Sequence, residues 1–443
     1  MTSLEPPAPD APAPHASATP EEARPRLLTA RWVFPIVGPP IRDGAIRIEG
    51  QRIVAVGRRR DVPGAGAARE ELGDAAILPG LVNCHAHLEL GAVGRVAASS
   101  FVGWLLEVRA RRAALPPPAH AAAAAAGARA LLAGGVTCVG DVSTAGRSLA
   151  GLAAAGLRGV VYREVLGVEP ERAAAALEAA RADLAAMAGS GGPLLRAGLS
   201  PHSPYACSEA LLRGAARLAA RVRVPLCMHV AESREEREYL AAGTGDIPAR
   251  LYPAVGAAPP PRRPAGSPLA YLDALDAIPA QSLLVHAVHL EAGDLPRLQG
   301  RRAGVAHCPR SNALLSGGVA PVPALLAARV PVGLGTDSLA GVASLDLWDE
   351  MRAALAAQAG GLEARAVLRM ATLGGAACLG LDRWVGSLEP GKQADLVAVS
   401  AAAVTPQAPE ASLLAGTTAA DVRLVLVAGA PRIARLEGAP VCR

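Results

Sequence analysis

Histidine and acidic residues occur at a few defined places in this 443-residue chain, and such side chains bind divalent metals and transfer protons. His85 and His87 end the apolar run LVNCHAH, and on a strand two residues apart point to the same side. His229 ends VPLCMH, and Asp337 ends VPVGLGTD. Three imidazoles and a carboxylate suit one divalent transition ion such as Zn²⁺, with Fe²⁺ as the alternative, and leave one coordination position for water.

Two further residues are predicted to act beside this centre. Glu232 comes three residues after His229, where the strand turns into its loop, and is a candidate general acid and base. His286 in VHAVHL is a candidate for stabilising charge or orienting the water. Asp337, as a ligand near the water, can share in the proton transfer.

The elements that carry these residues are typical of an α/β barrel. Between residues 79 and 384, eight apolar strand candidates are separated by segments long enough for crossover helices, which favours a (β/α)₈ barrel. Seven of the nine histidines lie near the carboxyl ends of these strands, where such barrels hold their active sites. A Pro/Gly-rich segment at 243–272 follows the fifth strand and is a candidate active-site loop.

The flanking segments predict two further parts. Short strands at 28–78 and 385–443 are expected to form one small β-sandwich domain built from both chain ends. Residues 1–27 are Pro/Ala-rich and are expected to form a disordered tail.

Composition excludes several classes of function. Hydrophobic residues make up 51% and charged residues 19%, which favours a large core. The net charge of +5 is modest and forms no basic stripe, so we expect no nucleic-acid partner. No apolar run reaches the roughly 18 residues that cross a bilayer, so we expect no membrane span. Seven dispersed cysteines without a C-x-x-C pair favour reduced thiols and a cytoplasmic protein.

The segments PGLVNCHAHLE, SPHSPYACS, MHVAES, HAVHL, HCPRSN, GTDS and EPGKQADLV together resemble the amidohydrolase superfamily, in its branch of deaminases and chlorohydrolases that act on aminated heterocycles. The resemblance covers residues 28–437. It implies a metal-dependent hydrolase of C–N bonds in cyclic amidines, in which His85, His87, His229 and Asp337 bind the metal. It also implies catalytic roles for Glu232 and His286, a small-molecule substrate and a homodimer.

The single lysine of the chain bears on the number of ions. Two-metal members of this superfamily often bridge their ions with a carboxylated lysine at the end of strand four. Lys392 lies in the EPGKQADLV turn, far from that position, where the chain reads LSPHSPY. We therefore expect one ion per chain.

Five residues are candidate substrate contacts. Glu89 is expected to bind a ring N–H or a ribose hydroxyl, or else to be a carboxylate at the rim, and His202 is a candidate contact from strand four. Arg310 and Asn312 follow strand seven; the guanidinium is expected either to bind a substrate carboxylate or to form an internal ion pair. Trp104 is expected either to stack on the substrate or to pack in the core.

Within the branch, HLEL, FVGW and HCPRSN most resemble the aminodeoxyfutalosine deaminases, which convert an adenine to hypoxanthine and release ammonia in menaquinone biosynthesis. The alternatives are an adenosine, S-adenosylhomocysteine or guanine deaminase, or a triazine hydrolase. A barrel with a purely structural metal is the remaining alternative, and the acid and base groups beside the centre speak against it. After GTDSLA the chain reads GVASLDLWDE, where relatives often carry an Asn-rich turn.

Overall fold

The computed structural model describes residues 24–97, 99–260 and 264–435. Most of the predicted tail, 1–27, lies outside these residues. The first strand, β1, begins at Arg26.

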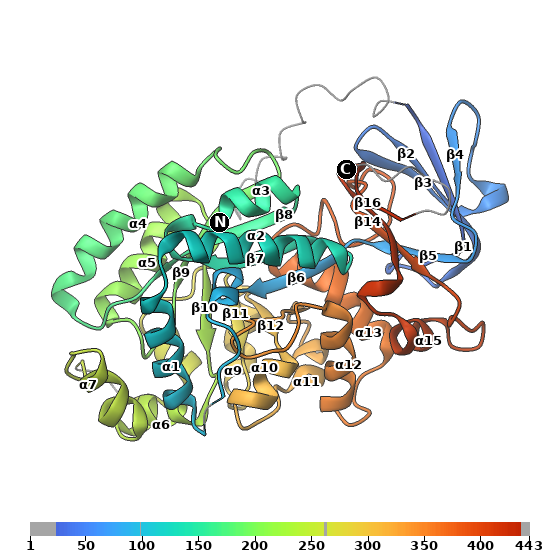
Figure 1. Ribbon diagram of the computed structural model, residues 1–443. Coiled ribbons are helices and arrows are strands. Elements are labelled where there is room, and N and C mark those ends of the chain that lie inside the picture. The colour runs from blue at the N-terminus through green and yellow to red at the C-terminus, as the bar shows by residue number, and fades with distance from the viewer. Residues whose placement is uncertain (1–23, 98, 261–263, 436–443) are drawn as a thin grey trace, which may run out of the picture.

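Eight parallel strands form the predicted barrel (Figure 1). Hydrogen bonds join them in the order β10–β11–β12–β13–β6–β7–β8–β9, and a bridge between Leu199 and Leu226 closes the ring. The eight predicted strands are confirmed, because strands buried on both faces appear in the sequence as continuous apolar runs. Their bounds are β6 Leu81–Ala86, β7 Val136–Ser143, β8 Arg158–Val165, β9 Leu195–Pro201, β10 Cys227–Val230, β11 Leu283–His286, β12 Gly304–His307 and β13 Val332–Leu334.

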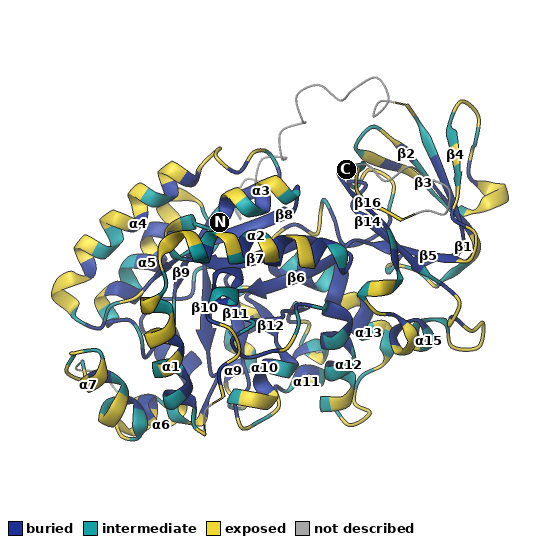
Figure 2. Ribbon diagram, in the orientation of Figure 1, coloured by how far each residue is buried: buried dark blue, intermediate teal, exposed yellow. Residues whose placement is uncertain are grey.

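Helices follow the barrel strands along the chain and turn their exposed residues outward, whereas the strands are buried (Figure 2). They are α1 Phe101–Ala114, α2 Pro117–Ala133, α3 Leu149–Ala155, α4 Ala173–Met187, α5 Glu209–Val222, α6 Arg234–Ala242, α7 Tyr252–Ala254, α8 Pro268–Ala274, α9 Asp294–Arg301, α10 Pro309–Leu315, α11 Val322–Ala327, α12 Leu347–Ala357, α13 Ala364–Arg369 and α14 Gly375–Cys378. A further helix, α15 Pro409–Gly416, lies between two strands of the second sheet.

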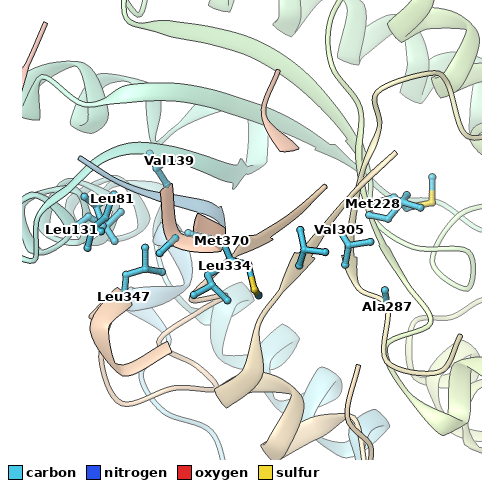
Figure 3. Close-up of a cluster of buried hydrophobic side chains, with 14 of the residues drawn as sticks. Leu81, Leu131, Val139, Met228, Ala287, Val305, Leu334, Leu347 and Met370 are labelled. Carbon is cyan, nitrogen blue, oxygen red and sulfur yellow. The ribbon is translucent and has the colours of Figure 1, made fainter. Parts of the chain in front are cut away.

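Consecutive strand residues supply two different cores. Leu81 of β6 and Leu334 of β13 point outward and lie in one buried cluster with Leu131 of α2 and Leu347 of α12 (Figure 3). Val82, the next residue along β6, belongs to a second cluster. This alternation follows from the two-residue period of a strand. Burying one such leucine side chain stabilises the fold by about 1.5–3 kcal/mol.

The second sheet is built from both ends of the chain, as expected. Its eight strands are joined in one hydrogen-bonded sheet, in the order β16–β15–β14–β5–β1–β2–β3, with β4 paired to β1. β5 is antiparallel to β14 and parallel to β1, so it joins the two ends. The bounds are β1 Arg26–Val33, β2 Ile41–Glu49, β3 Arg52–Arg58, β4 Ala68–Glu71, β5 Ala75–Pro79, β14 Leu396–Ser400, β15 Val422–Val427 and β16 Ala430–Ala434.

The passage from this sheet to the barrel is tightly packed. Gly80 separates β5 from β6, and a Cβ at this position would lie 2.0 Å from Thr137 Oγ1. Nearby, Arg158 at the start of β8 donates to both carboxylate oxygens of Asp395, at 2.7 and 3.0 Å, and both side chains are buried. The N–H of Ala428 donates to the same carboxylate at 2.7 Å. This ion pair fastens the barrel to the composite sheet.

Two expectations from composition concern the described residues. None of their helices combines the length and apolar character that a bilayer crossing requires. The cysteines among them are unpaired and buried: Cys84, Cys138, Cys207, Cys227, Cys308 and Cys378.

Candidate active site

A cavity of about 470 Å³ lies at the carboxyl ends of the barrel strands. It is the place where residues from different strands can meet, because the strands are parallel and their ends share one rim. Seven of the predicted site residues line it: His87, Trp104, His202, His229, Glu232, His286 and Asp337.

Three histidines converge beside this cavity, and two of them, His87 and His229, line it. One ring nitrogen from each of His85, His87 and His229 lies within 4.8 Å of the others, and all three residues are buried. Nε2 of His87 lies 3.1 Å from Nε2 of His229. Asp337 approaches the same point, since its Oδ1 lies 3.8 Å from Nε2 of His85 and 3.9 Å from Nε2 of His87. The structure thus brings together the four predicted ligands.

The protonation pattern of these rings fits a metal. Nδ1 of His229 lies 2.8 Å from the carbonyl oxygen of His202, and because a carbonyl only accepts, Nε2 carries the lone pair. Neither ring nitrogen of His85 has a hydrogen-bond partner among the described residues, although both are buried. Burial lowers the pKa of His87 to about 3, so its ring is neutral. Neutral imidazoles with converging lone pairs suit a divalent ion with nitrogen ligands.

Backbone and side-chain bonds fix the carboxylate that completes this set. Ser311 Oγ donates to Oδ2 of Asp337 at 2.5 Å, which leaves Oδ1 toward the histidines. The N–H of Asp337 donates to the carbonyl of His85, and the N–H of His87 donates to that of Asp337, both at 3.1 Å. These bonds tie the ends of β6 and β13 together. Hydrogen bonds of the barrel itself therefore hold these donor groups in place.

Glu232 and His286 lie beside these groups as a pair. Oε1 of Glu232 lies 3.5 Å from Nε2 of His286, and both side chains are buried. Burial, with the negative charge of Asp337, raises the pKa of Glu232 well above its usual range. Nδ1 of His286 lies 2.8 Å from Oδ1 of Asn312, and burial lowers its pKa, so the neutral ring presents a lone pair at Nε2. One proton can therefore be exchanged between the two groups.

Asn312 and Glu89 were predicted as substrate contacts, but neither lines the cavity. Asn312 orients His286 through the bond just described. Glu89 is buried and accepts from Ser143 Oγ and from the N–H of Thr144. Glu89 thus faces the end of β7, which agrees with the alternative that it is a carboxylate at the rim.

Arg310 requires a correction, because it does not line the cavity and its guanidinium has internal partners. Its Nε lies 2.8 Å from Oε1 of the buried Glu350, and its Nη1 lies 3.4 Å from Oδ2 of Asp349. Nη1 also donates to Ser344 Oγ at 2.9 Å. Of the two predicted alternatives the structure has the internal ion pair. The acidic partners come from GVASLDLWDE, the segment that follows GTDSLA.

The cavity is instead lined by arginines that the sequence interpretation missed. Arg109 and Arg112 come from α1, and Arg172 lies between β8 and α4. Arg112 pairs with the buried Glu164 at 3.4 Å, whereas Arg109 and Arg172 form no ion pair with any described residue. A signal existed in SFVGWLLEVRARR, because positions four apart on a helix share a face and Trp104, Val108 and Arg112 follow that spacing.

The segment predicted as an active-site loop supplies part of the cavity wall. Leu251 ends a short π-helix, Ile247–Leu251, and lines the cavity together with Tyr252, Val255 and Ala257. Residues 261–263 of this segment lie outside the described residues.

Comparisons with known proteins bear on these observations. The chain is 34% identical, over 84% of its length and 84% of the relative, to 5-methylthioadenosine/S-adenosylhomocysteine deaminase of Pelotomaculum thermopropionicum. It is 36% identical, over 80% of its length and 86% of the relative, to aminodeoxyfutalosine deaminase of Deinococcus radiodurans. Among solved structures, an adenosine deaminase from Xanthomonas campestris with bound zinc is similar with a TM-score of 0.76, 28% identity and 93% coverage of both chains.

A sequence model of the amidohydrolase family matches residues 76–431, which includes every barrel strand and all four converging donor groups. This match spans well over half of the chain. The alignments with the two deaminases also cover most of the length of each relative. The chain therefore belongs to the amidohydrolase family.

Proposed function

We propose that the protein is a metal-dependent hydrolytic deaminase of aminated purine nucleosides. The observation that carries the proposal is the convergence of four donor groups beside a buried Glu232–His286 pair, in a cavity large enough for a small molecule. In this proposal one divalent ion, zinc, is held by His85, His87 and His229 with Asp337. The zinc in the similar Xanthomonas structure supports that choice.

The proposed chemistry divides between the ion and the side chains. A bound zinc ion supplies Lewis acidity and lowers the pKa of water. Glu232 takes a proton from the attacking water and delivers it to the leaving amine, which departs as ammonia. His286 is held by Asn312 with its Nε2 toward Glu232. It accepts a proton in its neutral form and donates to developing charge once protonated.

The charged side chains on the cavity wall narrow the range of candidate substrates. Arg109 and Arg172 place two guanidinium groups on its wall that pair with no acidic side chain of the described residues, and guanidinium pairs well with carboxylate. A nucleoside with an acidic group at its far end has a partner there, whereas methylthioadenosine, adenosine, guanine and triazines offer none. We propose aminodeoxyfutalosine, whose benzoate group would meet these arginines, with a role in menaquinone biosynthesis.

S-adenosylhomocysteine is the second candidate substrate. It carries an amino group beside its carboxylate, and Glu169 lines the cavity near Arg172 in sequence, so an amino-acid zwitterion also finds both charges. The relatives named above include deaminases of both kinds.

An ammonia-release screen of the zinc-loaded protein tests the proposal. Aminodeoxyfutalosine, S-adenosylhomocysteine, methylthioadenosine, adenosine, guanine and a chlorotriazine are compared by kcat/KM. We expect the highest value for a carboxylate-bearing nucleoside. Release from none of these compounds, with metal content verified, would overturn the deaminase assignment, and a preference for methylthioadenosine would overturn the role of the arginines.

The double substitution Arg109→Gln and Arg172→Gln measures that role. We expect KM for the carboxylate-bearing nucleoside to rise about 100-fold, because each of the two lost charge-assisted bonds contributes on the order of 1.5 kcal/mol, or about 10-fold. KM for methylthioadenosine and kcat should change less than about 3-fold, since neither contact involves the purine. Arg111→Gln is the matched control, because Arg111 is exposed on the same helix, pairs with Glu107 and does not line the cavity.

A further inference from the structure

One buried carboxylate near the site has no part in the proposed chemistry. Glu236 lies in the first turn of α6, is fully buried, and does not line the cavity. Its Oε1 accepts from the N–H of Ala231 at 3.1 Å, and its Oε2 accepts from the N–H of Glu232 at 2.8 Å. Both carboxylate oxygens thus bind the short turn that leads from β10 to α6.

The backbone of this turn is held by hydrogen bonds from neighbouring segments. Ala231 has a φ of 54°, in the left-handed region that favours glycine, so neighbouring bonds must hold it there. Its carbonyl accepts from the N–H groups of Val288 and His289, both at 2.9 Å. The peptide groups around Ala231 are therefore hydrogen-bonded on two sides, to the turn after β11 and to Glu236. The bend lets His229 and Glu232 face the same cavity.

We infer that Glu236 is a positioning residue that holds the backbone of Glu232, and with it the 3.5 Å approach of the Glu232 carboxylate to His286. The inference rests on the proposed function for its kinetic part, because Glu232 is the catalytic acid and base only in that proposal. Its structural part, the grip on two backbone N–H groups, does not depend on the substrate.

The contacts separate this role from ordinary helix capping. Ser233 caps α6, since its Oγ accepts from the N–H of Glu236 at 3.1 Å. Glu236 therefore binds the turn in addition to the cap. Glutamine cannot reproduce both bonds, because one end of its amide is an NH₂ donor that would face a backbone donor. Aspartate is one methylene shorter and cannot place both oxygens at the same two groups.

Kinetics of Glu236→Gln and Glu236→Asp test the inference on the full-length, zinc-loaded protein. We expect kcat to fall about 100-fold, the order of loss that a misplacement of about 1 Å causes, with KM changed less than about 3-fold and metal content unchanged. Asp294→Asn is the matched control. Asp294 is also buried, and it accepts from Ser267 Oγ at 2.6 Å and from the N–H of Glu291 at 2.9 Å, away from the cavity. It should lower the unfolding temperature similarly and leave kcat unchanged.

Amide hydrogen exchange over residues 229–234 supplies a measurement that needs no substrate. Exchange at Ala231 and Glu232 should accelerate in Glu236→Gln and Glu236→Asp and stay unchanged in Asp294→Asn. Unchanged exchange, a kcat loss equal to that of Asp294→Asn, or a loss that follows metal content would each overturn the inference. If the wild type deaminates nothing, the proposed function fails, and the exchange result still decides whether Glu236 holds this turn.

Discussion

Glu232→Gln is expected to lower kcat about 1,000-fold or more while the protein keeps its metal. Glu232 is asked both to take the proton of the attacking water and to protonate the leaving amine, and one general acid–base group contributes about 10²–10⁴ in rate. The amide keeps the size of the side chain but cannot carry the proton. Because Glu232 lies beside the converging donors without being one of them, the metal content should stay at the wild-type value.

Steady-state kinetics and metal analysis of the same preparation check this result. Glu238→Gln is the control, since Glu238 lies on α6, the helix that follows Glu232, is exposed and accepts from Thr244 Oγ1. It should be fully active. Retained turnover in Glu232→Gln would remove Glu232 from its proposed role, and joint loss of metal and activity would make it a ligand.

Removal of the metal is the second large effect that we expect. Dialysis against a zinc chelator should abolish activity, and about one equivalent of zinc per chain should restore it. Removal should also lower the unfolding temperature, since an ion that binds only the folded state at 1,000 times its Kd stabilises that state by about 4 kcal/mol. We expect one ion per chain because a second ion would need a bridging lysine at the end of strand four. The chain's single lysine, Lys392, instead donates to the carbonyl of Asp382 and to Ser387 Oγ.

Metal analysis and thermal unfolding measure both parts. His229→Gln should lose the ion, whereas His289→Gln should keep it, because Nε2 of His289 binds the carbonyl of Ser316 instead. Reproducible recovery of two ions per chain would contradict the single-ion site, and full activity after verified removal of metal would contradict a metal role altogether.

The sequence was sufficient for the barrel and for the residues that converge in it. Apolar runs such as VTCVGDVS are buried along their whole length, which makes parallel strands visible without an alignment. Since the carboxyl ends of such strands share a rim, histidines and acids at those ends had to meet there. The four predicted donors do so within a few ångströms.

Contacts between side chains of different helices and strands could not be predicted from the sequence in the same way. Arg310 lies at a strand end like the other site residues, but Glu350 and Asp349 from α12 bind its guanidinium. Arg172 was passed over because it lies in a connecting segment, whose position depends on packing rather than on residue period. The partner of Arg310 and the position of Arg172 depend on contacts between distant segments, and a single sequence does not show which segments are in contact.

The pairing of β5 with β14 has a consequence for how the protein is made. β5 is complete when residue 79 has been synthesised, and its partner β14 begins at residue 396. At about 5–20 residues per second, the wait is roughly 15–60 s on the ribosome. During it β5, whose five residues are all buried in the finished fold, has an open edge, the kind of surface that aggregates. All eight barrel strands emerge in this interval, so the barrel can be assembled before the sheet beside it, and a chaperone that covers the Ala75–Pro79 edge would protect the nascent chain.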